Sequence, residues 1–209
     1  MVYHEKHIKI IESSERLFAK HGFDATSVRQ IADEAEINIA MISYYFGNKE
    51  KLLEAIFNYR AIDSSQRIET ILNNKSLTSF QRIEELIDYY IERFFKQSDF
   101  YKIMMSEQVN NKRENTHQLI LDFKIKLQKI LKKFIQDGQK EGSFKKNIDL
   151  PMMMNTMIGT ISHTVTTQNH YKVINHLDDL SEEQFQKTIK KKLQTQLKFI
   201  FKAILIHEA

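Results

Sequence analysis

Very few residues in this chain can interrupt a helix. Its 209 residues include one proline and five glycines, the two residue types that most often end or break regular structure. Dipeptides that form tight β-hairpins are nearly absent. The Asp137-Gly138 pair is of this type, but it lies inside a helical pattern. The sequence therefore predicts an all-α fold built from long, uninterrupted helices.

Composition limits the class of protein further. Apolar residues make up 42% of the chain and charged residues 28%, which is typical of a globular protein with a substantial core. Cysteine is absent, so disulfides and thiolate metal sites are excluded. The first residues do not resemble a signal peptide, and no apolar run reaches the roughly 18 residues of a membrane span. We expect a cytoplasmic protein that does not bind membranes.

The distribution of charge does not by itself identify a partner. The net charge of +4 is compatible with nucleic-acid binding. However, residues 1–50 contain six Lys or Arg against eight Asp or Glu, a net charge of −2. The basic excess lies in residues 112–146 and 187–202, along amphipathic patterns that are typical of solvated helix faces.

Hydrophobic periodicity predicts three helices in the first part of the chain. The first runs from about His4 to Lys20 and stops at Gly22, which suits a left-handed helix end. Thr26 or Ser27 caps the second helix. The third is short, covers residues 38–46 and has an asparagine as its predicted N-cap.

A fourth helix begins at Lys49, and longer amphipathic helices follow it. Their apolar residues recur at steps of three and four, as one helix face requires. The stripes are Phe80, Ile83, Ile87, Tyr90 and Phe94; Ile120, Phe123, Leu127, Ile130 and Phe134; and Phe185, Ile189, Leu193, Leu197, Phe201 and Ile204. Residues 137–144 are predicted to form a turn, and Pro151 opens the next helix. We expect about nine helices in total.

The short third helix is too small to be a core by itself. Residues 26–46 have the layout of a helix-turn-helix unit, whose second helix enters the major groove of DNA. Ala40 and Ser43 are small enough for close approach to DNA. Hydroxyl or charged groups suited to phosphate contacts are carried by Thr26, Ser27, Tyr44, Tyr45 and Lys49. A packing role is an equal alternative for Tyr44.

This region resembles the DNA-binding segment of the TetR family of transcriptional regulators. The matching features are RLFAKHGFDATSVRQIA in the first two helices, Tyr-Tyr-Phe at the end of the third, and GNKEKLL at the start of the fourth. They cover about residues 8–57, and the rest of the chain is similar only in size, helicity and helix count. The resemblance implies a helix-turn-helix DNA-binding domain over residues 1–48 and a helical ligand-binding and dimerisation domain over residues 49–209.

The resemblance also implies roles for single residues. Phosphate contacts are implied for Thr26, Ser27, Tyr45 and Lys49, and contacts near bases or sugars for Asn38, Ala40, Met41 and Tyr44. Arg29 and Ser43 complete the set of residues expected at the DNA interface.

Two departures from the family pattern bear on this interface. Glu36 occupies the helix-turn-helix turn where the family usually has glycine, so a left-handed backbone there costs roughly 1–2 kcal/mol. The third helix also has no Arg or Lys to bridge guanine, the commonest specific contact. We therefore expect contacts to thymine methyl groups and recognition of an A·T-rich operator.

Methionine and aromatic side chains gather in the later helices. They either fill the core or line a pocket for a hydrophobic ligand, and a core role is the alternative for each residue. The predicted pocket residues are Tyr90, Phe94, Tyr101, Met104, Met105, Phe123, Met153, Met157, Thr160 and His163. No metal site is predicted, because His4 and His7 lack a third ligand at a suitable spacing.

The resemblance implies a homodimer held by the last two long helices, residues 152–170 and 185–206, which would pair with their symmetry mates as a four-helix bundle. The predicted interface residues are Gly159, Ser162, Thr166, Leu193, Leu197, Ile200 and Ile204.

The expected function is therefore that of a homodimeric regulator, most often a repressor in such families, which binds a palindromic double-stranded operator. An unknown small, hydrophobic effector would release it from DNA. One alternative is a ligand-independent dimeric regulator, and another is a helical-bundle enzyme or carrier. No nucleophile elbow, phosphate-binding loop or HExxH motif is present, so we expect neither an enzyme nor a cofactor.

Overall fold

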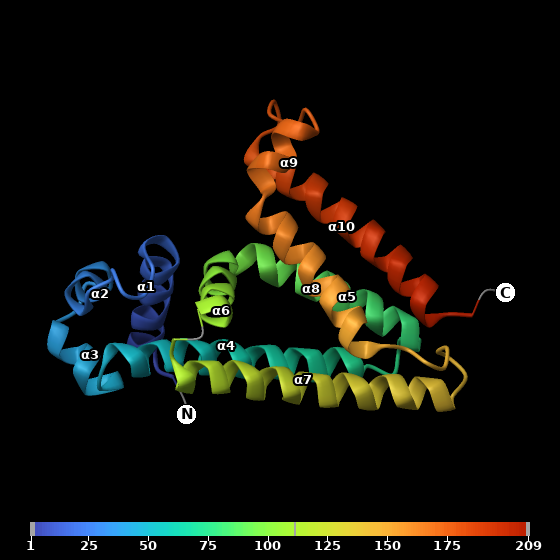
Figure 1. Cartoon of the computed structure of the whole chain (residues 1–209), viewed down its shortest axis with the longest axis horizontal. Coiled ribbons are helices and arrows are strands. Elements are labelled where there is room, and N and C mark those ends of the chain that lie inside the picture. Colours follow the sequence, from blue (N-terminus) through green and yellow to red (C-terminus); the bar gives the residue numbers. More distant parts are fainter. Residues whose placement is uncertain (1–2, 111, 208–209) are drawn as a thin grey trace. The chain divides into compact units, whose positions relative to one another are not determined.

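The computed structural model describes residues 3–110 and 112–207 and contains ten helices and no strand over those ranges (Figure 1). The all-α prediction is confirmed. The chain forms two compact units, Met1–Gln66 with Asp99–Lys126, and Arg67–Ser98 with Leu127–Ala209. The compact division therefore differs from the predicted boundary after residue 48, because the first unit continues well past the helix-turn-helix.

The first unit holds the three N-terminal helices together with parts of later ones. Its helices are α1 (Glu5–His21), α2 (Val28–Glu34), α3 (Ile39–Phe46), most of α4 (Lys49–Leu72), α6 (Ser98–Asn110) and the beginning of α7 (Glu114–Lys140). The first three helices contact one another in chain order. Their shared core consists of fully buried apolar side chains, among them Ile10, Ile11, Ile31, Ala35 and Ile42.

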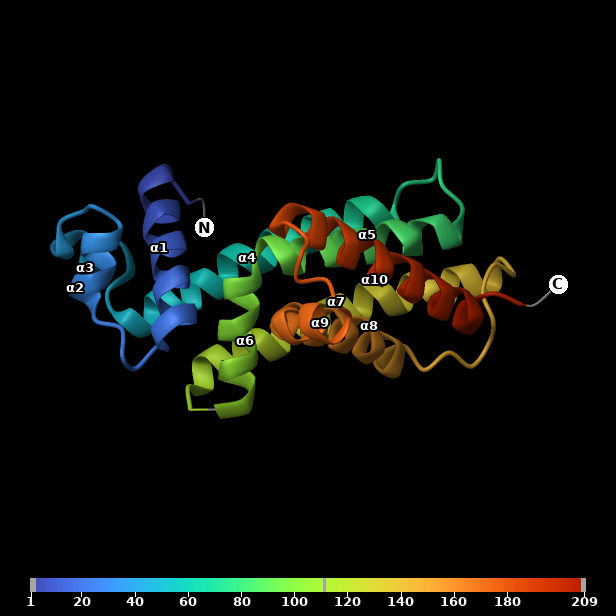
Figure 2. The same ribbon diagram turned by 90° about the horizontal axis from the view of Figure 1, so that it is seen from above.

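The second unit is built around α5 (Ser79–Lys96), which contacts both α8 (Leu150–Thr166) and α10 (Glu182–Leu205). The short α9 (Gln168–Ile174) connects α8 to the loop before α10 (Figures 1 and 2). Five residues of the predicted α10 stripe are buried, namely Phe185, Ile189, Leu193, Leu197 and Phe201, but the sixth buried residue is Leu205, because the predicted Ile204 is only half-buried. Two ion pairs of 2.7 Å, Lys190–Glu92 and Lys198–Asp88, also join α10 to α5.

Two boundaries differ from the sequence prediction. The helix expected over residues 152–170 breaks near Thr167, whose hydroxyl donates to the His163 carbonyl at 2.7 Å, and α9 begins separately. Hydroxyls that bond back to the preceding turn compete with the helical ladder. At the other boundary, α7 continues to Lys140, and the turn begins at Glu141 and includes Gly142, whose φ is 75°.

Pro151 lies in the first turn of α8, as predicted. Within the part of the chain that the structure describes, no helix has an apolar stretch long enough to cross a membrane.

Candidate nucleic-acid interface

The start of α2 is fixed by a capping box. The Ser27 hydroxyl accepts from the Gln30 backbone N–H at 3.2 Å, and the Gln30 side chain accepts from the Ser27 N–H at 2.7 Å. Ser27, and not Thr26, is therefore the N-cap. Its side chain is exposed, and its O–H still has a proton to donate to an acceptor such as a phosphate.

Thr26 has a structural role, which corrects the expectation that it contacts DNA. It is 1% exposed, and its hydroxyl donates to the Gly22 carbonyl at 2.8 Å. A side chain that is enclosed and already bonded is not available to a phosphate. Arg29, in the first turn of α2, is exposed and remains a candidate for a phosphate contact.

The turn between α2 and α3 contains the departure from glycine. Glu36 has a φ of 50°, so the left-handed conformation expected at this position is present. Its carboxylate lies 2.8 Å from the Lys9 ammonium on α1. The hydrogen bond from Lys9 lowers the pKa of Glu36, and the pairing offsets the negative charge of this carboxylate.

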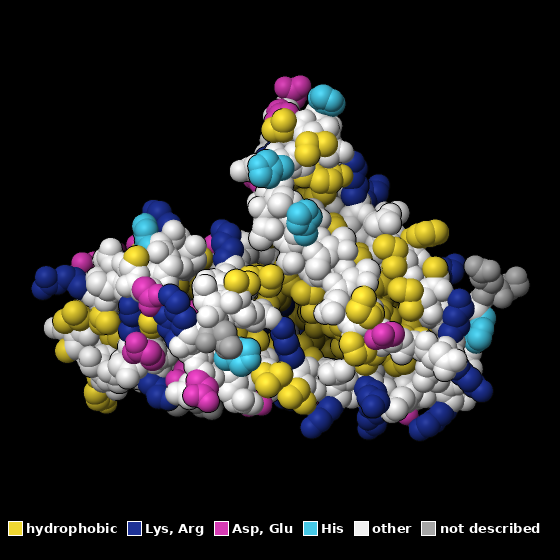
Figure 3. All heavy atoms as spheres, viewed as in Figure 1, with side chains coloured by type: hydrophobic (Ala, Val, Ile, Leu, Met, Phe, Trp, Pro, Cys, Tyr) yellow, Lys and Arg dark blue, Asp and Glu magenta, His cyan; other side chains and the backbone are white. Residues whose placement is uncertain are grey.

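One face of α3 is exposed to solvent. Asn38 caps the helix by accepting from the Ala40 N–H at 2.9 Å, and Ile42 is the buried side chain that holds α3 to the core. Exposed side chains are contributed by Ile39, Ala40, Ser43 and Tyr44, with Met41 half-buried. Figure 3 shows hydrophobic side chains on the surface where α3 lies. This face offers methyl, aromatic and hydroxyl groups and no charge.

The two tyrosines differ in their surroundings. Tyr44 is 80% exposed, so the packing alternative is excluded for it. Tyr45 is half-buried, and its ring centroid lies 4.3 Å from that of His7 on α1. The histidine therefore holds the ring of Tyr45 from within the protein, a contact that sequence analysis did not anticipate.

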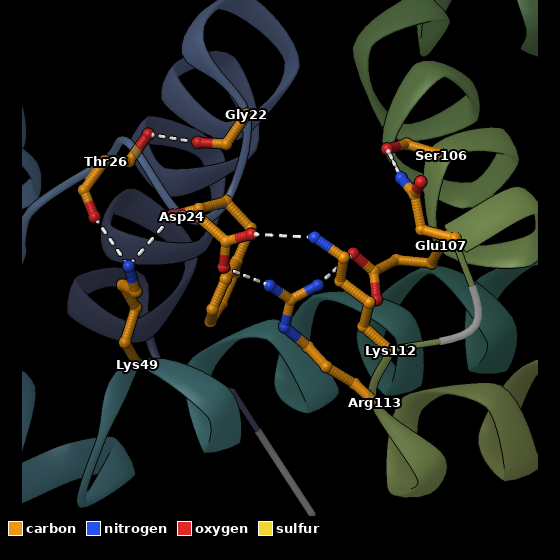
Figure 4. A network of polar contacts seen from close by, with 10 residues as sticks. Gly22, Asp24, Thr26, Lys49, Ser106, Glu107, Lys112 and Arg113 are labelled. Carbon is orange, nitrogen blue, oxygen red and sulfur yellow. Dashed lines mark hydrogen bonds and ion pairs between the residues drawn. The ribbon is translucent and has the colours of Figure 1, made fainter.

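Lys49 has partners inside the protein. Its ammonium donates to the backbone carbonyls of Phe23 and Thr26, both at 2.8 Å (Figure 4). It also lies 4.3 Å from the centroid of the Phe23 ring. Two of its three N–H donors are thus used to hold the turn between α1 and α2, which leaves one for a phosphate.

Two of the predicted effector residues of the first unit line a small cavity. Met104 on α6 and Phe123 on α7 line an enclosed space of about 20 Å³ together with Phe57, Asn58, Ala61, Phe100, Leu119 and Ile120. Tyr101 is buried, whereas Met105 is exposed. Two of the four predicted residues therefore meet at one apolar cavity.

The predicted effector residues of the second unit belong mainly to its core. Tyr90 and Phe94 on α5 are buried, as are Met153 and Met157 on α8, and the two helices contact each other. Thr160 is half-buried, while His163 is exposed on α8. His163 therefore does not share the enclosed environment of the other four.

The predicted dimer residues separate into two groups. Gly159 and Thr166 are exposed, while Ser162, Ile200 and Ile204 are half-buried. Leu193 and Leu197 are buried within the protomer, so the expectation that they form a dimer interface is wrong. The exposed aromatic residue of α10 is Phe199, at 71% exposure, which lies off the predicted stripe.

Family models match both parts of the chain. A model described as bacterial regulatory proteins, tetR family, matches residues 10–56. A model of the tetracyclin repressor-like C-terminal domain matches residues 80–194, which is more than half of the chain.

Individual relatives are named as regulators. The probable HTH-type transcriptional regulator YttP of Bacillus subtilis is 56% identical over 46 residues, which is 22% of each chain. The fatty acid metabolism regulator protein of Bacillus subtilis is 24% identical over 78% of this chain and 82% of its own. This chain matches only part of several curated relatives. The matched segment covers 22% of the length of YttP, 19% of YuxN and 64% of YerO, all three from Bacillus subtilis.

Solved structures share the fold along almost the whole chain. FadR from Bacillus halodurans has a TM-score of 0.72 at 18% identity and covers 95% of this chain and 97% of its own. FadR from Bacillus subtilis, solved in complex with stearoyl-CoA, has a TM-score of 0.67 at 21% identity, with coverage of 91% and 96%.

Proposed function

This chain belongs to the TetR family of bacterial regulatory proteins, and we propose that it is a homodimeric transcriptional repressor that a hydrophobic effector releases from a palindromic operator. The observation that carries the proposal is the exposed, uncharged face of α3, presented beside the capped start of α2. Its place of action is the cytoplasm, where the DNA is.

The chemistry of α3 sets the kind of operator. Ile39, Ala40 and Met41 present apolar groups, which suit thymine methyl groups, and no residue of α3 can bridge guanine with two hydrogen bonds. Phosphate contacts come from the edges of this surface, at Ser27, Arg29 and Tyr45 together with the remaining donor of Lys49. We infer an A·T-rich operator.

The exposed faces of α8 and α10 support the proposed dimer. Gly159 and Thr166 place small groups on the exposed side of α8, which also carries the exposed Met152 and His163, and Phe199 projects from α10. We infer that these faces pair with their symmetry mates. A two-fold dimer places its two α3 helices in successive major grooves about 34–36 Å apart, which requires a palindromic operator.

The effector site is inferred from the apolar cavity beside Met104 and Phe123. At about 20 Å³ it is far smaller than the pockets of several hundred Å³ that hold small molecules, so a ligand has to open it. The similarity to fatty acid regulators, one of them solved with stearoyl-CoA, makes long-chain acyl-CoA esters the first class to test.

Binding to the DNA upstream of the chain's own gene tests the proposal directly. Fluorescence anisotropy at low ionic strength should show saturable binding to a fragment that contains an A·T-rich palindrome, with two protomers per site. The same palindrome with its central steps replaced by G·C pairs is the control. A protein that is monomeric at micromolar concentration, or that binds both duplexes equally, would refute the proposal.

The small cavity also favours a second candidate function, a regulator whose larger part is only a dimer scaffold. Addition of acyl-CoA esters of increasing chain length to the protein–DNA complex separates the two. Release of DNA that depends on chain length supports the sensor, whereas binding unaffected by every hydrophobic compound supports the scaffold.

A further inference from the structure

Arg113, the residue before α7, joins three parts of the first unit (Figure 4). One guanidinium nitrogen donates to Glu107 Oε1 on α6 at 2.7 Å, and the other donates to Asp24 Oδ1 in the turn between α1 and α2 at 2.5 Å. The guanidinium carbon lies 3.8 Å from the centroid of the Phe23 ring. Arg113 thus connects α6 and α7 to the turn that leads into α2, and the Lys112 ammonium adds a longer ion pair to Asp24, at 3.9 Å.

The two ion pairs of Arg113 have different environments. The side chain of Glu107 is 6% exposed and that of Arg113 is 16% exposed, whereas that of Asp24 is 71% exposed. A buried carboxylate requires a charged or hydrogen-bonding partner, so the Glu107 pair fixes Arg113 firmly. The fixed guanidinium then presents its second edge to Asp24, in the fork geometry that only arginine provides.

The turn that Arg113 holds is also held by Lys49. The Lys49 ammonium binds the carbonyls of Phe23 and Thr26 and lies over the same Phe23 ring. This short turn ends at Ser27, the N-cap of α2. Its position therefore sets where Ser27 and Arg29 stand relative to α3.

We propose that Arg113 is a positioning residue for operator binding, which acts through Asp24 and Phe23 and never touches DNA. The proposal rests on the proposed DNA-binding function. It assigns a part in DNA binding to a residue of the segment 80–194, which the C-terminal family model matches. Any movement of α6 that withdraws Glu107 would loosen the turn and reduce phosphate contacts at the start of α2.

Asp24 allows a test in which removing a negative charge is expected to weaken operator binding. DNA repels every acid on the DNA-binding unit, so removing a carboxylate normally strengthens binding. If Asp24 instead fixes the turn through Arg113, then Asp24→Asn weakens binding although it removes a negative charge. Asp33→Asn on α2 is the matched control, because Asp33 is an exposed acid for which the described residues provide no ion pair.

The experiment measures operator affinity over a range of salt concentrations for the full chain. Asp24→Asn and Arg113→Ala should each lower affinity about tenfold, and the double variant should lose no more than either single variant. Arg113→Lys should not restore binding. Two control variants change an exposed charge. Lys126→Ala, on α7, should keep the affinity apart from the small effect of one lost positive charge, and Asp33→Asn should keep or raise it.

The salt slope separates positioning from a loss of folded protein. Loss of a phosphate contact lowers the slope of log K against log salt by about one, whereas partial unfolding lowers only the active fraction. Circular dichroism confirms that each variant is helical. An Asp24→Asn protein that binds like Asp33→Asn, or an Arg113→Ala protein with unchanged affinity and slope, overturns the positioning role.

Amide hydrogen exchange in the free protein provides a readout that does not depend on DNA. Residues 23–29 should exchange faster in Arg113→Ala than in Lys126→Ala, while α5 and α10 exchange as in the unmodified chain. Unchanged exchange of this turn overturns the proposal. If the unmodified chain binds no promoter fragment, the proposed function fails, but the exchange result still decides whether Arg113 fixes the turn.

Discussion

The Lys9 ammonium lies 2.8 Å from Glu36 Oε2, and this pair links the first helix to the turn that precedes the DNA-facing helix. Glu36 holds a left-handed backbone conformation, with φ at 50°, which favours glycine. The pair and the backbone therefore act in opposite directions on the stability of the turn. The charge of Glu36 also opposes DNA, so its partner matters for binding.

Glu36→Gly should raise the melting temperature by a few degrees and should also tighten operator binding. Glycine removes the backbone strain, whereas the lost ion pair is exposed and weak. Lys9→Ala should instead weaken binding, because it leaves the Glu36 charge unpaired beside DNA. Thermal melts and anisotropy titrations check both outcomes, and a lower melting temperature for Glu36→Gly would contradict this explanation.

The same pair has a defined pH dependence. Because the hydrogen bond from Lys9 lowers the pKa of Glu36 in the folded state, its contribution is present at neutral pH and is lost as the pH falls through that lowered pKa. The difference in melting temperature between Lys9→Ala and the unmodified chain should therefore shrink towards acid pH.

Thr26→Val should reduce stability without changing the DNA contacts. The variant removes the hydroxyl that donates to the Gly22 carbonyl at 2.8 Å in a buried position, and we expect a loss of about 1–2 kcal/mol of unfolding free energy. Urea unfolding measures this loss. The salt slope of operator binding should equal that of the unmodified chain. A reduced slope would show that Thr26 contacts a phosphate after all.

Tyr44→Ala should have the opposite profile. The side chain is 80% exposed, so the unfolding free energy should change by no more than about 0.5 kcal/mol. Operator affinity should fall by about tenfold or more, since the ring is available for contact with DNA. Equal urea midpoints together with equal affinities would show that Tyr44 lies outside the interface.

The first three helices could be predicted because their signals are local. The capping residue Asn38, the stop at Gly22 and the apolar spacing of the helices depend on neighbours within a few positions. Backbone strain at Glu36 was likewise predictable, because the TetR pattern specifies a turn at that position.

The roles of Thr26 and Arg113 could not be predicted from spacing. Both depend on partners that the fold brings together, and Arg113 lies 89 positions from Asp24 in the chain. The misassigned Leu193 and Leu197 show a related limit. An apolar stripe predicts that a helix face is covered, but not whether its own protomer or a partner covers it.

Arg60 and Glu15 form a two-point ion pair between α4 and α1, with distances of 2.9 and 3.0 Å. Both side chains are largely enclosed. Arg60→Met leaves the Glu15 carboxylate buried, and we expect a loss of about 3 kcal/mol in unfolding free energy at neutral pH. Adding Glu15→Gln should recover part of this loss, as measured by urea unfolding.

The pH dependence of Arg60→Met follows from Glu15. Burial raises the pKa of Glu15, and the hydrogen bond from Arg60 acts against this effect. Without Arg60 the raised pKa should rise further, so the deficit should be largest at neutral pH and should decrease as the pH falls and Glu15 takes up a proton. A deficit that grows towards acid pH would contradict this assignment.

Gly159 and Gly138 form a matched pair of helical glycines. A methyl group added at Gly159 meets no atom within 4 Å in the protomer, whereas at Gly138 it would clash with the ring of Phe144. Gly138→Ala should therefore cost about 1–3 kcal/mol through overpacking, while the better helix propensity of alanine makes Gly159→Ala neutral or stabilising by up to about 1 kcal/mol in an isolated protomer.

Gly159→Leu then tests the dimer, because leucine fits the protomer but not a close crossing of α8 with its symmetry mate. Analytical ultracentrifugation should show that Gly159→Leu dissociates at concentrations where the unmodified chain is dimeric. Operator binding should then fall steeply, since each half-site is bound independently. Lys126→Leu, at an exposed position on α7 and so on neither of the two proposed interface helices, controls for added surface hydrophobicity. If Gly159→Leu remains fully dimeric, the outer face of α8 is not the interface, and the dimer must form through another surface.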